Sequence, residues 1–426
     1  MKILVVSHNV FSKTSNMGKT LASYFKDLES CELAQFYIHS EVPTDSICEN
    51  YYRITDKEAI KSIFTRKSGT VLGKDDIRND VVTSRTDTGT TAKLYQRARK
   101  RTPMTYIARN MWWRLGAWKT KKMRAWLDEF NPDVVFFASG DYGFMYKIAL
   151  EIAKYKNIPL LPCCMDDYFL YNKNSSSIFG RWAHKRFMKQ VKRTMEYASC
   201  IFTICDKMNR DYSALFNKPC KTLHTSATIT EPLEREAGNA ISYIGNLSYM
   251  RYKQLISLGH ALKDVHCDGK PEFIDVYSAE KRDFILNEMT EENGIRFHGS
   301  IDQTEVLNVM KRSLAVIHTE SFNEDARKSV AYSVSTKIAD SLASGVCLIA
   351  YGPSEVASIA YLIENEAALC ITENDDVKEK LTSLISDGAM RDGIVANALS
   401  LAKKNHCAAN NCNVIQSVLD GICKNK

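Results

Sequence analysis

The chain has 426 residues, a length that predicts two domains and excludes a single small module. Hydrophobic residues make up 45% of the chain and charged residues 25%, which excludes a disordered, collagen-like or low-complexity protein. The formal net charge of +7 is modest, and no apolar run approaches the ~18 to 20 residues that a membrane-spanning helix needs.

Short apolar runs alternate with helical patterns along nearly the whole chain, which is typical of parallel βαβ units. In the first half, the expected strands are 3–7, 134–138, 160–164 and 201–205, and the expected helices include 18–28, 145–155 and 182–197. In the second half, the expected strands are 241–244, 274–277, 295–298, 314–318, 346–350 and 368–371. The pattern predicts an α/β protein with two consecutive doubly wound, Rossmann-like halves.

The boundary between the halves is expected between Thr225 and Asn239, a polar stretch that contains Pro232 and shows no clean period. We predict an N-terminal domain over residues 1–228, a C-terminal domain over 229–408 and a final helix over 409–426. The sequence does not reveal what this final helix packs against. Residues 40–92 are polar and weakly periodic, which favours a loop-rich insertion over a separate domain.

The cellular compartment follows from the N-terminus and the cysteines. The first residues lack the long apolar segment and the cleavage site of a signal peptide. The 13 cysteines are scattered except for the adjacent Cys163 and Cys164, and no Cys-x-x-Cys pair occurs to seed a zinc or redox site. We therefore expect a reduced, cytoplasmic protein.

One segment, 93–126, is both basic and rich in tryptophan. Between Thr88 and Leu127 no acidic residue occurs, and eleven cations do: Lys93, Arg97, Arg99, Lys100, Arg101, Arg109, Arg114, Lys119, Lys121, Lys122 and Arg124. The same stretch holds four of the five tryptophans, Trp112, Trp113, Trp118 and Trp126. Because indole rings favour the lipid headgroup zone and cations favour anionic lipid, the segment predicts peripheral binding to the inner face of the cell membrane.

Two other interpretations of this segment remain open. In one, the tryptophans pack inward on ordinary helices whose cations face water. In the other, the basic and aromatic residues bind single-stranded nucleic acid. No RRM, KH or zinc-finger pattern occurs, so a nucleic-acid partner is not expected. A second basic run, 181–193, contains Trp182 and can extend the same surface.

Polar residues directly after the expected strands are the first candidates for a site, because parallel sheets bind ligands beyond the carboxyl ends of their strands. In the first half these are Gly18, Asp141, Asp166 and Asp167. The sequence 18–20 ends like a P-loop, but Lys13 occupies a position where that motif needs glycine, which argues against ATP hydrolysis. Gly18 can open a helix toward an anion or sugar, or form a plain turn. Asp166 and Asp167 can hold an acceptor hydroxyl or position a base, or they can cap a helix.

Several well-known chemistries lack their motif. No Gly-x-Gly-x-x-Gly supports a dinucleotide site, and no Asp-x-Asp supports a metal-bridged diphosphate. His-x-x-His and Gly-x-Ser-x-Gly are also absent. His8, His224, His298 and His318 each lie near a strand end, where a structural, hydrogen-bonded histidine is favoured over a ligand. No metal site is expected.

The most informative block is 333–353. Ser335 and Thr336 can cap a helix that starts near Lys337, Gly345 ends that helix, and a buried strand follows. The free amides of the helix start, two hydroxyls and one ammonium group make a good cradle for a diphosphate. Asp340 lies one turn further along, where it can accept hydrogen bonds from a ribose.

This block resembles the donor-binding segment of GT-B glycosyltransferases, in particular the family 4-like enzymes of bacterial surface-polysaccharide assembly. The resemblance rests on Ser-Thr-Lys-(x)3-Ser-Leu-Ala-Ser-Gly at 335–345 and Tyr-Gly-Pro at 351–353. It extends to 241–247 with Arg251 and Lys253, to 297–299 with Glu305, and to 8–12. It covers most of the second half and only patches of the first.

The resemblance implies two facing Rossmann-like domains with a cleft between them, a nucleotide sugar held by the second and an acceptor held by the first. In this family an Arg and a Lys, five positions apart, neutralise the donor diphosphate. Asn246 and Arg251 stand at these positions, so one cation is missing and Lys253 or Lys337 must replace it. Asp340 matches the second of two family glutamates, and Glu320 and Glu324 are candidates for the first.

The resulting predictions for the site fall into three groups. The catalytic candidates are Arg251, Lys253, Lys337 and Asp141, and the donor-binding candidates are Gly245, Asn246, Ser278, His298, Gly299, Glu305, Ser335, Thr336 and Asp340. The acceptor-side candidates are Gly18, Asp166 and Asp167. The resemblance implies retention of anomeric configuration, with no metal and no cofactor besides the nucleotide sugar.

The main hypothesis is a glycosyltransferase that moves a sugar from a nucleotide donor to a lipid-linked or polysaccharide acceptor, as in capsule synthesis. A sugar-nucleotide epimerase of similar shape is an alternative, because fold does not determine function. A non-catalytic nucleotide-sugar-binding or scaffold protein is another, motivated by the missing cation at Asn246.

Overall fold

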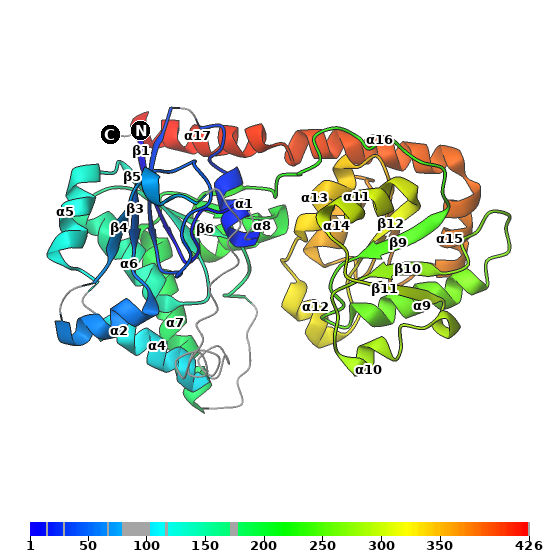
Figure 1. The fold of residues 1–426 in the computed structure, drawn as a ribbon, viewed down its shortest axis with the longest axis horizontal. Helices are drawn as coiled ribbons and strands as arrows, with labels where there is room; N and C mark the ends of the chain where they lie inside the picture. Colours follow the sequence, from blue (N-terminus) through cyan, green and yellow to red (C-terminus); the bar gives the residue numbers. More distant parts are fainter. Residues whose placement is uncertain are drawn as a thin grey trace. The chain divides into compact units, whose positions relative to one another are not determined.

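The structure is a computed structural model that describes residues 1–13, 16–28, 30–65, 68–78, 103–115, 118–170 and 178–424. The chain divides into two compact units (Figure 1). The first contains residues 1–223 and 411–426, and the second contains residues 224–410. No helix of the described residues has the length and hydrophobicity needed to cross a bilayer.

The first unit is built on a sheet of eight described strands in the order β4-β3-β2-β1-β5-β6-β7-β8. Its strands are β1 (Lys2–Ser7), β2 (Glu32–Tyr37), β3 (Tyr51–Arg53), β4 (Thr70–Leu72), β5 (Val134–Ser139), β6 (Leu160–Cys164), β7 (Ile201–Thr203) and β8 (Cys220–Thr222). All neighbours are parallel except β3 and β4. The central strand β1 is buried from Ile3 to Val6, as expected for a parallel strand covered on both faces.

Helices cover both faces of this sheet (Figure 1). They are α1 (Asn16–Ser23), α2 (Asp56–Thr65), α4 (Pro103–Leu115), α5 (Lys121–Phe130), α6 (Gly143–Lys156), α7 (Ile178–Tyr197) and α8 (Asp206–Phe216), with a 3-10 turn η1 at Lys74–Asp76. The C-terminal helix α17 (Ala408–Lys424) also belongs to this unit. Its Cys412, Ile415 and Leu419 are buried in the same core as Tyr24 and Phe25.

The second unit contains a sheet of six described strands, all parallel, in the order β11-β10-β9-β12-β13-β14. The strands are β9 (Ala240–Ile244), β10 (Ile274–Tyr277), β11 (Ile295–Gly299), β12 (Ser313–Thr319), β13 (Cys347–Tyr351) and β14 (Leu369–Ile371). The helices are α9 (Arg251–Lys263), α10 (Asp283–Leu286), α11 (Gln303–Arg312), α12 (Glu324–Val330), α13 (Thr336–Ala343), α14 (Ala357–Glu364), α15 (Val377–Ser386) and α16 (Gly388–Asn405), with a 3-10 turn η2 at Glu291–Asn293.

The chain passes between the units twice, and the two passages are tied together within the second unit. The backbone N–H of Ala227 donates to the carbonyl of His406 at 2.8 Å. The ring of His406 contacts the carbonyl of Thr225 at 2.7 Å through Nδ1 and the hydroxyl of Tyr361 at 3.0 Å through Nε2. Burial lowers the pKa of His406 to about 4, so the imidazole is neutral near pH 7.

The observed elements agree with the alternating pattern, and the expected strands of both halves are present. One expectation is wrong for the part of 40–92 that the structure describes. Residues 51–53 and 70–72 form β3 and β4, which extend the first sheet, and α2 lies between them. Three-residue strands are too short to show a period of two, which is why the sequence pattern missed them. Residues 79–92 lie outside the described residues.

Candidate active site

The carboxyl ends of β9 and β12 bring together residues that are far apart in sequence. β9 ends at Ile244 and is followed by Gly245 and Asn246, and α9 begins at Arg251. The neighbouring strand β12 ends at Thr319 and is followed by Glu320. We call Asn246, Arg251, His318, Glu320 and Lys337 the Arg251 cluster.

Arg251 is held in a fixed orientation by a bidentate ion pair. Its Nη2 donates to Glu320 Oε1 at 2.7 Å, and its Nε donates to Glu320 Oε2 at 3.0 Å. Nε also donates to the carbonyl of Thr319 at 3.1 Å, and Nη1 donates to Asn246 Oδ1 at 3.1 Å. The Glu320 side chain is only 1% exposed, so little water competes for these contacts.

Burial acts on every titratable group of this cluster. It raises the pKa of Glu320, an effect that the neighbouring Arg251 only partly offsets. Burial opposes the charge of Arg251 as well, but the ion pair with Glu320 raises the pKa of Arg251. Burial, and then the nearby guanidinium, lower the pKa of His318 to about 3. His318 is therefore neutral, and its Nε2 contacts the hydroxyl of Ser358 at 2.9 Å.

Lys337 reaches the same end of the sheet from the first turn of α13. Its Nζ donates to the carbonyl of Ile244, the last residue of β9, at 2.8 Å. Loss of hydration around the ammonium group, and then the nearby Arg251, lower the pKa of Lys337. The cap of this helix is as expected, because the Ser335 side chain accepts from the backbone N–H of Lys337 and α13 begins at Thr336.

Asp340 is engaged with the chain segment that enters the second unit. Its Oδ1 accepts from the N–H of Thr228 at 2.5 Å, from the hydroxyl of Thr228 at 2.8 Å and from the N–H of Ile229 at 3.3 Å. In this arrangement the carboxylate fastens residues 228–229 to α13. All three contacts use Oδ1, and a role of Asp340 in ribose binding stays a prediction.

The loop after β9 is shaped by close backbone approaches. A side chain at Gly245 would place its Cβ 2.7 Å from the hydroxyl of Tyr243. That hydroxyl donates to the carbonyl of Asn246 at 2.6 Å, so glycine allows the loop to fold back over β9. Lys253 lies in the first turn of α9 with an exposed side chain.

The remaining donor-side candidates lie on β10, β11 and α11. Ser278 follows β10 and is 5% exposed, and its Oγ has no hydrogen-bond partner among the described residues. Its N–H donates to the carbonyl of Gly299 at 2.7 Å, which places both at the same sheet edge. His298 contacts Asp275 Oδ1 at 2.7 Å through Nε2 and stacks on Tyr277. Glu305 accepts from Asn308 within α11.

In the first unit, the acceptor-side candidates make local structural contacts. A Cβ at Gly18 would lie 2.3 Å from the carbonyl oxygen of Val10, so glycine permits the loop to cross α1. Asp167 Oδ1 accepts from the hydroxyl of Tyr212 at 2.5 Å and from two backbone N–H groups that follow it. Asp166 accepts from the N–H of Asp167. Asp141 lies half-buried between β5 and α6.

The structure also assembles a group that the sequence did not single out. We call His8, Asp56, Arg109, Trp113 and Tyr142 the Arg109 cluster; it lies at the carboxyl ends of β1 and β5. Arg109 donates to Asp56 Oδ1 at 3.0 Å through Nε and contacts His8 Nε2 at 3.2 Å through Nη2. Trp113 Nε1 donates to the same Asp56 oxygen at 2.7 Å. The guanidinium lies 4.0 Å from the centroid of the Tyr142 ring.

His8 is neutral in this cluster. Burial, and then the charge of Arg109, lower the pKa of His8 to about 4. A strand-end position had marked His8 in the sequence, and Arg109 had been counted among the cations of 93–126. Asp56, however, begins α2 in a segment that the pattern assigned to a loop, and no local signal linked the three residues.

Three of the four tryptophans of 93–126 are buried, so these three do not make the predicted lipid contact. Trp113, Trp118 and Trp126 are 1%, 6% and 5% exposed, so they pack inside the unit. Trp126 Nε1 donates to Asn50, and the ring of Trp118 contacts Phe36. The inward-packing alternative is correct for these three residues, because Trp113 on α4, Trp126 on α5 and Trp118, which precedes α5, all have buried indole rings. Residues 93–102 lie outside the described residues.

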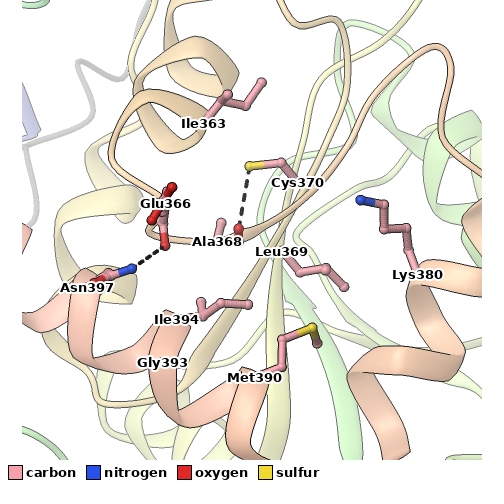
Figure 2. Close-up of a pocket in the computed structure, with 10 residues that line it drawn as sticks. All are labelled: Ile363, Glu366, Ala368, Leu369, Cys370, Lys380, Met390, Gly393, Ile394 and Asn397. Carbon is pink, nitrogen blue, oxygen red and sulfur yellow. Dashed lines mark hydrogen bonds between the residues drawn. The ribbon is translucent and has the colours of Figure 1, made fainter. Parts of the chain in front are cut away.

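A shallow groove of about 380 Å³ lies elsewhere in the second unit, at the β14 edge of its sheet (Figure 2). It is lined by residues of α14, β14, α15 and α16, among them Ile363, Leu369, Lys380, Met390 and Asn397. None of the predicted site residues lines it. Within the described residues, no group of three His, Cys, Asp or Glu side chains is placed to hold a metal ion.

With this geometry established, the chain can be compared with known proteins. Residues 260–417 match a family model described as glycosyl transferase-like. This match runs from the end of α9 into α17 and includes Glu320, Lys337 and Asp340. No curated protein matches the chain.

Solved structures match over nearly the full length of the chain. HepE from Anabaena, in complex with UDP, has a TM-score of 0.59 and 12% identity, covering 99% of this chain and 100% of its own. The whole chain matches the whole of sucrose-phosphate synthase from Thermosynechococcus elongatus at a TM-score of 0.58 and 10% identity. WaaG, a glycosyltransferase involved in lipopolysaccharide biosynthesis, matches at a TM-score of 0.53 and 12% identity over 98% of this chain and 99% of its own.

The chain has the GT-B fold of these solved structures, and its residues 260–417 resemble the glycosyl transferase-like family. The predicted fold class is confirmed by the solved structures. The predicted enzyme class, a glycosyltransferase, is borne out by the family model that matches residues 260–417. In this GT-B protein the Arg251 cluster lies at the carboxyl ends of the second sheet, and the Arg109 cluster lies at the carboxyl ends of the first.

Proposed function

We propose that this GT-B protein transfers a sugar from a nucleoside-diphosphate donor, held by its second unit, to a lipid-linked or growing polysaccharide acceptor. One observation supports the proposal above the others: Arg251 and Lys337 converge on the end of β9 from different helices. Solved HepE holds UDP, which makes uridine nucleotides the first donors to test.

The chemistry needs positive charge where the phosphate leaves. Cleavage of the bond between sugar and diphosphate leaves negative charge on the departing oxygen and positive charge at the sugar carbon. A fixed guanidinium, an ammonium group and the N-terminal amides of α13 stabilise that oxygen without a metal ion. We further propose that the anomeric configuration is retained.

Position 246 carries no cation, and Lys337 partly replaces the missing charge. Asn246 accepts a hydrogen bond from Arg251 Nη1, and Glu320 holds the opposite side of the guanidinium. Glu320 compensates the charge of Arg251, so Lys337 is the cation of this cluster that no carboxylate of the described residues pairs with. We therefore assign the larger part of diphosphate binding to Lys337.

The test is turnover and binding with a panel of nucleotide sugars, starting with UDP-sugars. Lys337→Ala removes one charge-assisted hydrogen bond, worth about 1.5–3 kcal/mol, so donor affinity should fall roughly 10- to 100-fold. Lys311→Ala, on the surface of α11, is the matched control. Equal donor affinity in Lys337→Ala and wild type would remove Lys337 from the site.

A second candidate function is nucleotide-sugar binding without catalysis. It is favoured by Glu320, which neutralises the one arginine at the family's cation positions. This function predicts a saturable affinity for UDP-sugars with no release of UDP in the presence of any acceptor extract. Release of UDP that depends on an acceptor would exclude it, and product formation from the nucleotide sugar alone would indicate an epimerase.

A further inference from the structure

Three helices of the first unit, α2, α4 and α7, carry apolar side chains on their outer faces. α4 packs against both α2 and α7, and the three lie at one end of this unit (Figure 1). Each helix presents an exposed apolar pair four residues apart, which places both members on one face. The pairs are Ile60 and Phe64, Met111 and Leu115, and Ile178 and Trp182. Phe179 adds a further exposed ring.

These exposed side chains are separate from the packing that holds the helices in place. On α4, Trp113 points inward and stacks on Phe144 with 4.8 Å between ring centroids. On α7, Phe187 is buried and meets the ring of Tyr146 edge-on. In contrast, Phe64, Ile178 and Phe179 are 86%, 74% and 71% exposed. Apolar groups with this exposure gain nothing from the fold of the described residues.

The charged residues around these pairs are mostly cations. The exposed ones on the three helices are Lys57, Lys61, Arg114, Arg181, Lys185, Arg186, Lys189, Lys192 and Arg193. α4 has no acidic residue. Of the two acids in α2, Asp56 binds Arg109 and Trp113, and Glu58 binds Thr55. The single acid of α7, Glu196, lies at the opposite end of that helix from Ile178.

We propose that the outer face of α2, α4 and α7 docks on an anionic lipid bilayer. Exposed aliphatic and aromatic side chains enter the boundary between headgroups and acyl chains, and each nearby cation adds ~1 kcal/mol of attraction to anionic lipid. The positive charge of this face favours an anionic bilayer over a second copy of the chain. Two copies meeting through this face would place two sets of cations against each other.

The proposal deepens the proposed function, because it places the first sheet's carboxyl end close to the lipid. α4 supplies Arg109, which contacts His8 directly after β1, and α2 supplies Asp56, which pairs with Arg109. Arg109 is two residues from Met111 on the same helix. A lipid-linked acceptor that lies in the bilayer would therefore bring its polar headgroup toward the Arg109 cluster. The proposed membrane contact is therefore made by these exposed side chains and not by the buried tryptophans of 93–126.

The experiment is co-sedimentation of the full chain with phosphatidylcholine vesicles, with and without phosphatidylglycerol, at low and high salt. Wild type should bind the vesicles that contain phosphatidylglycerol and should dissociate in high salt. Phe179→Ser with Trp182→Ser should weaken binding at least about tenfold, because both rings are exposed and their loss leaves the core intact. Phe284→Ser, at a 60% exposed ring of the second unit, is the matched control.

A second arm tests the charge. Arg181→Glu with Lys185→Glu should abolish binding to phosphatidylglycerol vesicles, whereas Lys403→Glu with Lys404→Glu on α16 should leave it unchanged. Wild-type binding by both α7 double variants would overturn the proposal, as would absence of wild-type binding at low salt. A dimer in solution that these variants dissociate, without any vesicle binding, would assign the face to a second copy and also overturn it.

Donor binding, measured by calorimetry with UDP, separates this proposal from the proposed function. The α7 variants should bind UDP as wild type does, because they lie outside the Arg251 cluster. If wild type binds vesicles but does not bind UDP, the glycosyltransferase proposal is contradicted and the docking proposal is retained.

Discussion

The Arg251 and Arg109 clusters contain the same types of residue but differ in their burial and in their neighbours. Each places an arginine, a carboxylate and a neutral histidine at the carboxyl end of a parallel sheet. In the second unit the carboxylate of Glu320 is 1% exposed and bidentate, whereas in the first unit Asp56 is 29% exposed and touches Arg109 through one oxygen. The second unit adds Lys337 as a further cation, and the first adds the aromatic face of Tyr142.

Under the proposed function, this difference favours an anion site in the second unit and a site for neutral or mixed groups in the first. A rigid guanidinium near an ammonium group favours phosphate, because both groups are cationic and the guanidinium is already oriented by its ion pair. An arginine stacked on a tyrosine, with a neutral histidine beside it, offers hydrogen bonds and an aromatic surface instead. The comparison therefore supports a donor diphosphate in the second unit and acceptor contacts in the first.

The largest expected effect comes from removing the buried carboxylate. Glu320→Ala leaves Arg251 buried without its partner and should lower the free energy of unfolding by about 3–5 kcal/mol. Asp56→Ala should cost less, about 1–3 kcal/mol, because water reaches Asp56 and can replace part of its hydrogen bonding. Urea denaturation of both variants measures the difference. An equal cost at the two positions would show that the clusters do not differ in burial.

Acid should act on both histidines in the same direction. The pKa values of His318 and His8 lie at about 3 and about 4 in the folded protein, below the ordinary value of about 6.5 in the unfolded chain. The unfolded state therefore takes up protons first, and stability is lost as pH falls from about 6.5 toward 4. Each histidine should contribute roughly 2–3 kcal/mol to this loss.

The measurement is the free energy of unfolding from pH 7 to about 4 in wild type, His318→Gln and His8→Gln. Each variant should show a shallower pH dependence than wild type, since glutamine keeps a hydrogen-bonding side chain without titrating. A His8→Gln curve that runs parallel to wild type would mean that His8 is accessible to protons in the folded protein. His260→Gln, at an exposed histidine of α9, serves as the control.

The smallest expected effect concerns the aromatic neighbours of the two arginines. Tyr142 lies 4.0 Å from the guanidinium of Arg109, and Tyr249 lies 5.5 Å from that of Arg251 with its ring half exposed. Tyr142→Leu should lower the free energy of unfolding by about 1 kcal/mol, and Tyr249→Leu by less than about 0.5 kcal/mol. Thermal unfolding of the two variants side by side tests this order. The reverse order would contradict the inference that the arginine–tyrosine contact is the stronger one in the first unit.

Local signals predicted several structural features around the candidate site of the second unit. The strand ends, the Ser335 cap and the start of α13 at Thr336 depend on residues within one turn or one loop, and the sequence pattern read them correctly. The sequence marked Lys337 as a candidate cation but did not predict its contact with the carbonyl of Ile244 at the end of β9. The partners of Asp340 were not foreseen, since Thr228 lies more than one hundred residues away.

By itself, the sequence determined the alternation of strands and helices, the two α/β halves and the positions of the cations after β9 and at the start of α13. Periodicity and capping are short-range properties, so they can be recognised in the sequence without knowledge of the fold. Only the tertiary structure decided that three tryptophans of 93–126 face inward, that α17 packs on the first unit, and that Asp56 meets Arg109. An amphipathic helix shows that it has a buried face, but the element that covers this face is chosen by packing across the whole chain.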